Sequence, residues 1–220
     1  MAYRDFVSLN HKATSRDYLA RVTQRDKAEV AEMAIKYGYD YWDGSRETGY
    51  GGYNYDGRWR KVADAMIETY GLKPGMRVLD VGSGKGFLLR DFKEAIPGLE
   101  VAGIDISSYG VEHTEESVKP FVQVGDAAKL PWPDNHFDLV ISITTLHNLY
   151  IYDLFAALKE MERVSRGGKY LCVEAYRNER EKVNLMYWQL TCRAFHTPAE
   201  WKWIFAQAGY TGDHEFIVFE

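Results

Sequence analysis

The stretch from residue 76 to 106 constrains the fold most, because two apolar runs there enclose a glycine-rich turn and a helix-like segment. The first run, MRVLDV at 76–81, leads into GSGKG, and the second, EVAGIDI, covers 100–106. Residues 87–95 between them are expected to form a helix. Strand, turn, helix and strand in this order make a βαβ unit, so we expect the two strands to run parallel.

The alternation of strands and helices continues through the rest of the chain. The further elements expected are a helix at 109–118, strands at 121–124 and 137–143, a helix at 154–164, a strand at 170–175, a helix at 197–208 and a strand at 215–219. This order predicts a doubly wound α/β fold, in which a mostly parallel sheet of six or seven strands is covered by helices on both faces.

The N-terminal part precedes this pattern. We expect one helix over 15–37 and another over 60–71 from the spacing of their apolar side chains. Between them, residues 37–59 hold six of the 16 tyrosines, two of the six tryptophans and six of the 19 glycines, without a helix or strand period. Loops of this length are usually functional or disordered, and the aromatic content argues against disorder. We therefore divide one compact unit into an N-terminal helix and aromatic segment, 1–59, and a main domain, 60–220.

Composition excludes several classes of protein. The chain has 220 residues, with 27 Lys and Arg against 32 Asp and Glu, and its net charge of −5 provides no positive field for holding nucleic acid. Two cysteines are too few for a disulfide framework, which favours a reducing compartment. No stretch approaches the roughly 18 apolar residues of a membrane span. We therefore expect a cytoplasmic protein that binds neither nucleic acid nor membrane.

The loop after the first strand is the first candidate site. Its glycines allow positive φ and let a ligand approach bare backbone. A phosphate-binding GxxxxGK(S/T) loop is excluded because Gly86 stands where Ser or Thr is needed, and GxGxxG is excluded because the third glycine comes one residue early. A structural turn without a ligand is the alternative. The candidate binding residues in the loop are Asp80, Gly82, Ser83, Gly84 and Gly86.

The pattern that remains, D/E-x-G-x-G-x-G, resembles that of the class I S-adenosylmethionine (SAM) dependent methyltransferases, of the type that acts on small molecules. The resemblance implies a Rossmann-like fold, SAM as cofactor and S-adenosylhomocysteine as product. It also implies that the glycine loop packs under the methionine part of SAM. The family usually ends in two antiparallel strands, whereas this chain has one clear strand after its last helix, so the sheet is expected to have six strands or a distorted edge.

Three further strand ends match the family in order and spacing. Asp105 ends the second strand 19 residues after Gly86, close to the ~20-residue spacing at which an acid meets a ribose hydroxyl, with capping of the next helix as the alternative. Gly125-Asp126-Ala127 resembles the family's adenine-facing element, although such residues also form ordinary turns. In the family, the end of the fourth strand passes beside the reactive methyl group. The residues expected to bind SAM here are Asp105, Ile106, Asp126, Ala127 and Ile143.

Methyl transfer to a hydroxyl or a protonated amine requires a base, and His147, just after the fourth strand, is the first candidate. A histidine that only lines the pocket is the alternative. Glu174 and Tyr176 close the fifth strand and are further candidates for proton transfer or acceptor binding. No metal is expected, because the other histidines lack the spacing of a metal motif: His11, His113, His136, His196 and His214.

The aromatic segment 37–59 is expected to act as a lid. Its rings would close over SAM and exclude water, with the glycines at 49, 51 and 52 as the hinge. Arg46 and Arg58 are candidates to pair with the SAM carboxylate or an anionic acceptor. A connector packed on the sheet edge is the alternative. The lid and acceptor residues expected are Tyr50, Tyr53, Arg58 and Trp59.

The sequence thus predicts a methyltransferase that acts on O or N of a small polar metabolite, with a sugar-like acceptor suggested by the YGGYNYDGRW block. The lack of an Asn-Pro-Pro-Tyr type tetrapeptide after Ile143 argues against methylation of nucleobases or glutamine amides. A protein or RNA methyltransferase, which would need a basic patch or an open groove, and a non-catalytic SAM-binding subunit are the alternatives. An inserted helix within 177–195 is expected to form an acceptor wall, a homodimer contact or ordinary core packing.

Overall fold

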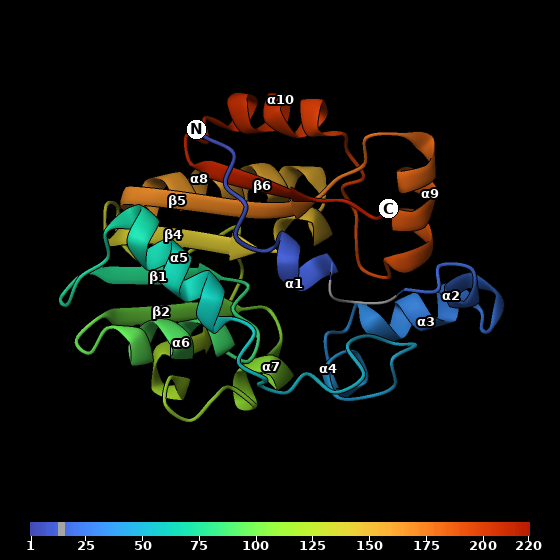
Figure 1. Cartoon of the computed structure of the whole chain (residues 1–220), viewed down its shortest axis with the longest axis horizontal. Helices are drawn as coiled ribbons and strands as arrows, with labels where there is room; N and C mark the ends of the chain where they lie inside the picture. The colour runs from blue at the N-terminus through green and yellow to red at the C-terminus, as the bar shows by residue number, and fades with distance from the viewer. Residues whose placement is uncertain (13–15) are drawn as a thin grey trace.

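Six parallel strands form one sheet in the residues that the computed structural model describes, 1–12 and 16–220 (Figure 1). Their order across the sheet is β3-β2-β1-β4-β5-β6, and every neighbouring pair is parallel. This confirms the predicted doubly wound sheet with six strands, and the last strand is parallel to its neighbour. The strands are β1 (Arg77–Val81), β2 (Glu100–Asp105), β3 (Val122–Val124), β4 (Phe137–Ile143), β5 (Ser165–Glu174) and β6 (Asp213–Ile217).

Helices cover both faces of the sheet because successive strand residues are apolar on either side. Val78 belongs to the core under α5 and α6, whereas Leu79 belongs to the core under α8 and α10. The helices are α1 (Ser8–Lys12), α2 (Ala20–Thr23), α3 (Lys27–Ala34), α4 (Tyr39–Trp42), α5 (Arg60–Tyr70), α6 (Phe87–Ala95), α7 (Ser108–Glu112), α8 (Ile151–Val164), α9 (Glu179–Trp188) and α10 (Pro198–Ala208), with 3₁₀ turns at Lys119–Phe121 and Leu146–Asn148. Helices α2, α3, α4 and α9 gather beyond the carboxyl ends of the strands (Figure 1).

The N-terminal part differs from the prediction. One helix is expected over 15–37, but α2 and α3 are separate, because the Asp26 carboxylate accepts hydrogen bonds from the N–H groups of Ala28 and Glu29 and thereby begins α3. The predicted start of that helix lies outside the described residues. The aromatic segment contains the short helix α4, which its sequence does not indicate, and α7 is shorter than the helix expected at 109–118.

The first residues of the chain extend along β6. Tyr3 forms a parallel bridge with His214. The buried Glu215 carboxylate accepts hydrogen bonds from the N–H groups of Phe6 (2.7 Å) and Val7 (3.0 Å). The N-terminal segment therefore covers the free edge of the sheet. No helix in the described part of the chain has the length and apolar character to cross a bilayer.

Candidate active site

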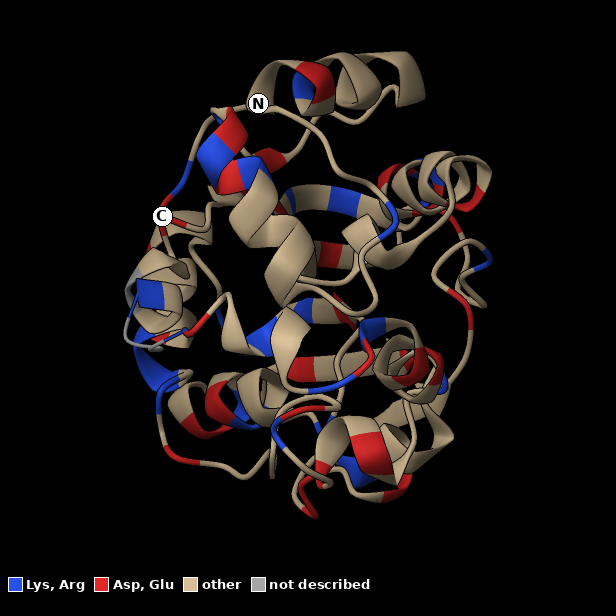
Figure 2. Cartoon of the chain, turned by 90° about the vertical axis from the view of Figure 1, so that its right-hand side faces the viewer, with Lys and Arg blue, Asp and Glu red and all other residues tan. Residues whose placement is uncertain are grey.

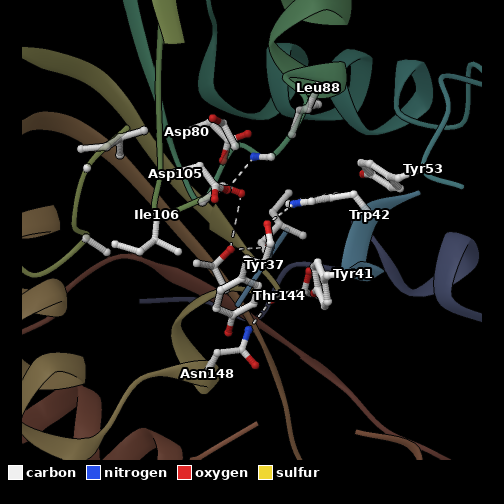
Figure 3. A pocket seen from close by; sticks show the side chains of 18 of the residues that line it. Tyr37, Tyr41, Trp42, Tyr53, Asp80, Leu88, Asp105, Ile106, Thr144 and Asn148 are labelled. Carbon is white, nitrogen blue, oxygen red and sulfur yellow. Dashed lines mark hydrogen bonds between the residues drawn. The ribbon is translucent and has the colours of Figure 1, made fainter. Parts of the chain in front are cut away.

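A first cavity, of about 280 Å³, opens at the carboxyl ends of β1 and β4, where the strand order reverses (Figure 3). Gly86 is the one predicted SAM-binding residue outside it. It begins α6, and a Cβ there would lie 2.9 Å from Thr114 and 3.0 Å from Val118, so its role is close packing. The predicted residues that line the cavity are Asp80, Gly82, Ser83, Gly84, Asp105, Ile106, Asp126, Ala127 and Ile143.

The glycine loop presents bare backbone to this cavity. Gly82 and Gly84 have φ values of +85° and +53°. A Cβ at Gly82 would lie 2.1 Å from Thr145 Oγ1, and one at Gly84 would lie 2.8 Å from the Trp42 ring. Both positions therefore require glycine, because a side chain would be strained and would collide with a neighbour.

Two carboxyl groups enter the cavity from β1 and β2 (Figure 3). Asp105 accepts hydrogen bonds from the N–H groups of Gly84 and Ser107, each at 2.8 Å, so it also fixes the loop and the start of α7. The carboxyl group of Asp80 is buried and accepts no hydrogen bond from the described residues, and burial together with the charge of Asp105 raises the pKa of Asp80 to about 7. A cationic group of a ligand would stabilise the ionised form of Asp80.

The side of the cavity next to β2 and β3 combines an apolar surface with a polar turn. Ile106 follows β2 and is 60% exposed, although it is apolar. Asp126 and Ala127 follow β3, and the Asp126 carboxylate accepts a hydrogen bond from the N–H of Ala128 at 2.8 Å. This turn holds Asp126 at the cavity edge.

Aromatic rings of the segment 37–59 close the other side. Trp42 stacks on Tyr50, with 5.4 Å between ring centroids and 11° between ring planes, and Tyr50 lies 4.4 Å from Tyr53. The Trp42 Nε1 donates to Ser107 Oγ at 2.9 Å. Trp42 and Tyr41 were not predicted as site residues, and only the aromatic density of the segment signals them.

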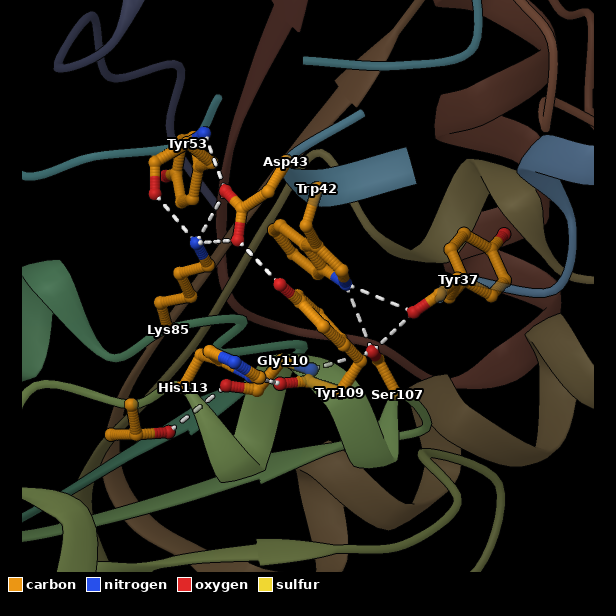
Figure 4. Close-up of polar contacts among 10 residues, drawn as sticks. Tyr37, Trp42, Asp43, Tyr53, Lys85, Ser107, Tyr109, Gly110 and His113 are labelled. Carbon is orange, nitrogen blue, oxygen red and sulfur yellow. Dashed lines mark hydrogen bonds and ion pairs between the residues drawn. The ribbon is translucent and has the colours of Figure 1, made fainter. Parts of the chain in front are cut away.

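An ion pair joins this segment to the glycine loop (Figure 4). The Lys85 ammonium lies 2.7 Å from both carboxylate oxygens of Asp43 and donates to the Tyr53 carbonyl oxygen at 2.9 Å. The Tyr109 hydroxyl donates to Asp43 at 2.8 Å. Although burial raises the pKa of Asp43, hydrogen bonds from Lys85 and Tyr109 hold it below its ordinary value. We call this set of contacts the Lys85–Asp43 latch, and no sequence motif indicates it.

A second cavity, of about 220 Å³, lies against the first. Thr144, directly after β4, has a φ of +53°, which is rare for a residue with a side chain and places strain between the two cavities. The predicted candidates that line the second cavity alone are Arg46, Arg58, His147 and Glu174. The residues that line both cavities are Tyr41, Tyr50, Tyr53, Trp59, Thr144 and Asn148.

His147 and Glu174 form a buried pair in the second cavity. The Glu174 N–H donates to His147 Nδ1 at 3.4 Å, so the neutral ring carries its proton on Nε2, which lies 3.4 Å from Glu174 Oε2. Gln189 donates to Glu174 Oε1. Burial raises the pKa of Glu174 to about 8 and lowers the pKa of His147 to about 3. Glu174 can therefore exchange a proton near neutral pH, and His147 stays neutral.

The remaining predicted residues have other surroundings. Arg58 pairs with Asp56 at 2.5 Å. Tyr176 lines neither cavity, and Lys182 lies over its ring at 5.3 Å. Acidic and basic residues are interspersed over this end of the molecule (Figure 2). The described residues include no group of three or more His, Cys, Asp or Glu side chains arranged to hold a metal ion.

Comparisons with known proteins agree with this geometry. A family model described as a methyltransferase domain matches residues 72–209. The ubiquinone/menaquinone biosynthesis C-methyltransferase UbiE of Laribacter hongkongensis is 42% identical over 115 residues, which are 49% of this chain and 46% of that protein. The chain thus matches about half the length of this curated relative.

Solved structures share the fold. A chain in the complex that contains the Haloferax volcanii Trm112 methyltransferase activator matches with a TM-score of 0.54 and 26% identity, over 70% of this chain and 73% of that one. The YcgJ protein of Bacillus subtilis matches with a TM-score of 0.53 and 25% identity, over 66% of each chain. With its six-stranded parallel sheet, glycine loop and matching family model, the chain belongs to the methyltransferase domain family, among the class I SAM-dependent methyltransferases.

Proposed function

We propose that this protein transfers the methyl group of SAM to a small acceptor held in the second cavity. The observation that supports this most is the shared lining: the cavity with the glycine loop and the cavity with Glu174 have side chains in common and therefore adjoin. Ligands in the two cavities would meet beside Thr144 and Asn148. Most of the rate of methyl transfer can come from such positioning.

The residues of the first cavity fit SAM. The bare backbone at Gly82 and Gly84 would lie against its methionine part, and the carboxylate of Asp80 would receive the ammonium group. Asp105 keeps acceptor capacity for the ribose hydroxyls, and the exposed Ile106 offers an apolar surface for adenine. When bound, SAM supplies an electrophilic methyl group on a sulfonium.

Glu174 is the group that we assign to proton transfer. Its Oε2 is buried and accepts no hydrogen bond from the described residues, and Gln189 holds the other oxygen. His147, the first candidate from the sequence, has both ring nitrogens turned toward Glu174 and is 2% exposed. We therefore propose that Glu174 accepts the acceptor's proton and that His147 positions Glu174.

The aromatic segment acts as a lid in this proposal. Trp42, Tyr50 and Tyr53 cover the first cavity, and the Lys85–Asp43 latch fastens them to the glycine loop. Closure removes water from the reacting groups. We propose residues 1–59 as an N-terminal helical part that includes the aromatic lid segment 37–59, and 60–220 as the SAM-binding domain of one unit, in a cytoplasmic protein whose two buried thiols are both free.

The acceptor is proposed to be a small polar molecule methylated on oxygen or nitrogen. Proton acceptance by Glu174 suits a hydroxyl or an ammonium group. Methyl transfer to carbon is the second candidate, because the relative with 42% identity is named a C-methyltransferase. The interspersed charges at this end (Figure 2) disfavour a protein or RNA acceptor, which would need a basic surface.

SAM binding tests the proposal directly. Titration calorimetry should show one SAM site, and Gly82→Ala should weaken binding by about tenfold or more, because its Cβ would collide with Thr145. Gly71→Ala is the matched control: Gly71 also has positive φ, but nothing lies within 4 Å of a Cβ there. Absence of SAM binding would overturn the proposal, and binding without label transfer to any acceptor in a metabolite extract would favour the non-catalytic subunit.

A further inference from the structure

Three arginine side chains surround one tryptophan at the second cavity. The guanidinium carbons of Arg16, Arg21 and Arg46 lie 5.3, 5.1 and 5.2 Å from the centre of the Trp188 ring. All four residues line the second cavity, and none lines the first. They come from separate parts of the chain: Arg21 from α2, Arg46 from the lid and Trp188 from the end of α9.

Two of these arginines have neutral partners only. Arg21 donates to the carbonyl oxygens of Trp188 (3.3 Å) and Arg46 (2.6 Å). Arg46 donates to the carbonyl oxygens of Gly49 (3.3 Å) and Tyr50 (3.1 Å). No carboxylate among the described residues lies within 4.0 Å of either guanidinium, although other arginines and lysines of the described chain pair with acids.

This arrangement brings positive charges together beside the cavity. Burial, and then the charge of Arg46, lowers the pKa of Arg21 to about 10. The carbonyl oxygens and the indole face offset part of this repulsion. Both guanidinium groups keep further N–H donors, since each has five and these contacts use one or two of its nitrogens.

We infer that the acceptor carries an anionic oxyacid group, a carboxylate or a phosphate, which Arg21 and Arg46 bind at the Trp188 end of the second cavity. The inference rests on the proposed function and names its substrate class. A guanidinium fork matches the paired oxygens of a carboxylate or phosphate. Glu174, at another part of the same cavity wall, is then available to the hydroxyl or amine of the same molecule.

The test uses the full chain, methyl-labelled SAM and a metabolite extract divided on an anion-exchange column. Label in the retained fraction supports the inference, and phosphatase treatment of that fraction distinguishes a phosphate acceptor from a carboxylate one. Label confined to the unretained fraction overturns the inference but leaves the proposed function intact. Label in neither fraction, with SAM bound, overturns the proposed transfer itself.

Substitution of Arg21 and Arg46 tests whether these side chains bind the anionic group of the acceptor. With the retained fraction as acceptor, Arg46→Gln and Arg21→Gln should each raise the apparent KM at least about tenfold, with kcat and SAM affinity nearly unchanged, and Arg46→Lys should recover part of the loss. Arg25→Gln is the matched control, because Arg25 pairs with Glu47 outside both cavities. A loss of SAM affinity with unchanged acceptor KM would instead assign these arginines to the SAM carboxylate and overturn the inference.

Discussion

Two of the buried carboxyl groups beside the cavities, Asp80 and Glu174, differ from His147 in the effect of burial on their pKa. Burial raises the pKa of each acid, to about 7 and about 8, because the ionised form loses its hydration. Burial lowers the pKa of His147 to about 3 for the same reason. A base works best when its pKa lies near the working pH, which favours Glu174 for proton transfer and leaves His147 a positioning role.

Glu174→Gln should reduce turnover by about 100-fold or more with little change in SAM affinity, because an amide cannot accept the proton. In the unsubstituted protein, kcat should rise as the pH increases through about 8, since only the ionised form of Glu174 accepts a proton. His147→Gln should move the midpoint of that profile. Rates of label transfer measured across this pH range check both statements.

The control for this experiment is Glu179→Gln, whose side chain is 86% exposed on α9. It should leave the rate and the pH profile unchanged. Full turnover in Glu174→Gln would remove Glu174 from the mechanism.

Among the elements, parallel strands bring the predicted site residues together, and rings of the aromatic segment 37–59 line the same cavity. The ends of β1, β2, β3 and β4 carry the predicted SAM-binding residues because parallel strands end at the same edge of the sheet. These ends were predictable, since short apolar runs and glycine turns are local signals. The Lys85–Asp43 latch was not predictable from the sequence, because it joins residues 42 positions apart and depends on how the aromatic segment folds.

For the lid, Lys85→Met and Asp43→Asn should each weaken SAM binding by roughly tenfold, because each leaves a buried charge or polar group without its partner. The double variant should bind SAM better than the two single losses together predict. Calorimetric titration of the four proteins measures this coupling. Arg60→Gln, which breaks the exposed pair with Asp64 on α5, should bind as the unsubstituted protein does. Additive losses would show that the latch does not hold the lid.

For the whole molecule, the first residues and the last strand are held together through one carboxylate. Glu215, completely buried, accepts hydrogen bonds from the N–H groups of Phe6 and Val7 and from the hydroxyl of Tyr170. Tyr170 lies on β5, so the contact joins the N-terminal segment to two strands. Segments more than 200 residues apart should therefore unfold together.

Glu215→Ala should lower the free energy of unfolding by about 3 kcal/mol, because it leaves three donors, two of them buried, without an acceptor. Cleavage by trypsin after Arg4 should accelerate as the N-terminal segment loosens. Denaturant unfolding and timed proteolysis measure the two effects. Tyr170→Phe removes one donor only and should have a smaller effect. Unchanged stability and protection in Glu215→Ala would contradict this role.

The sequence by itself determined the class of fold and indicated the strand-end residues that line the first cavity, because glycine turns, strand-terminal acids and apolar runs act over a few neighbouring residues. The break between α2 and α3 also has a local cause, the capping of α3 by Asp26. The prediction missed this break because the apolar spacing of a helix continues across it. Only the tertiary structure decided the second cavity. Its Glu174–His147 pair and the arginines around Trp188 come from distant segments. Burial shifts the pKa values of these side chains, and it exists only after the segments pack together.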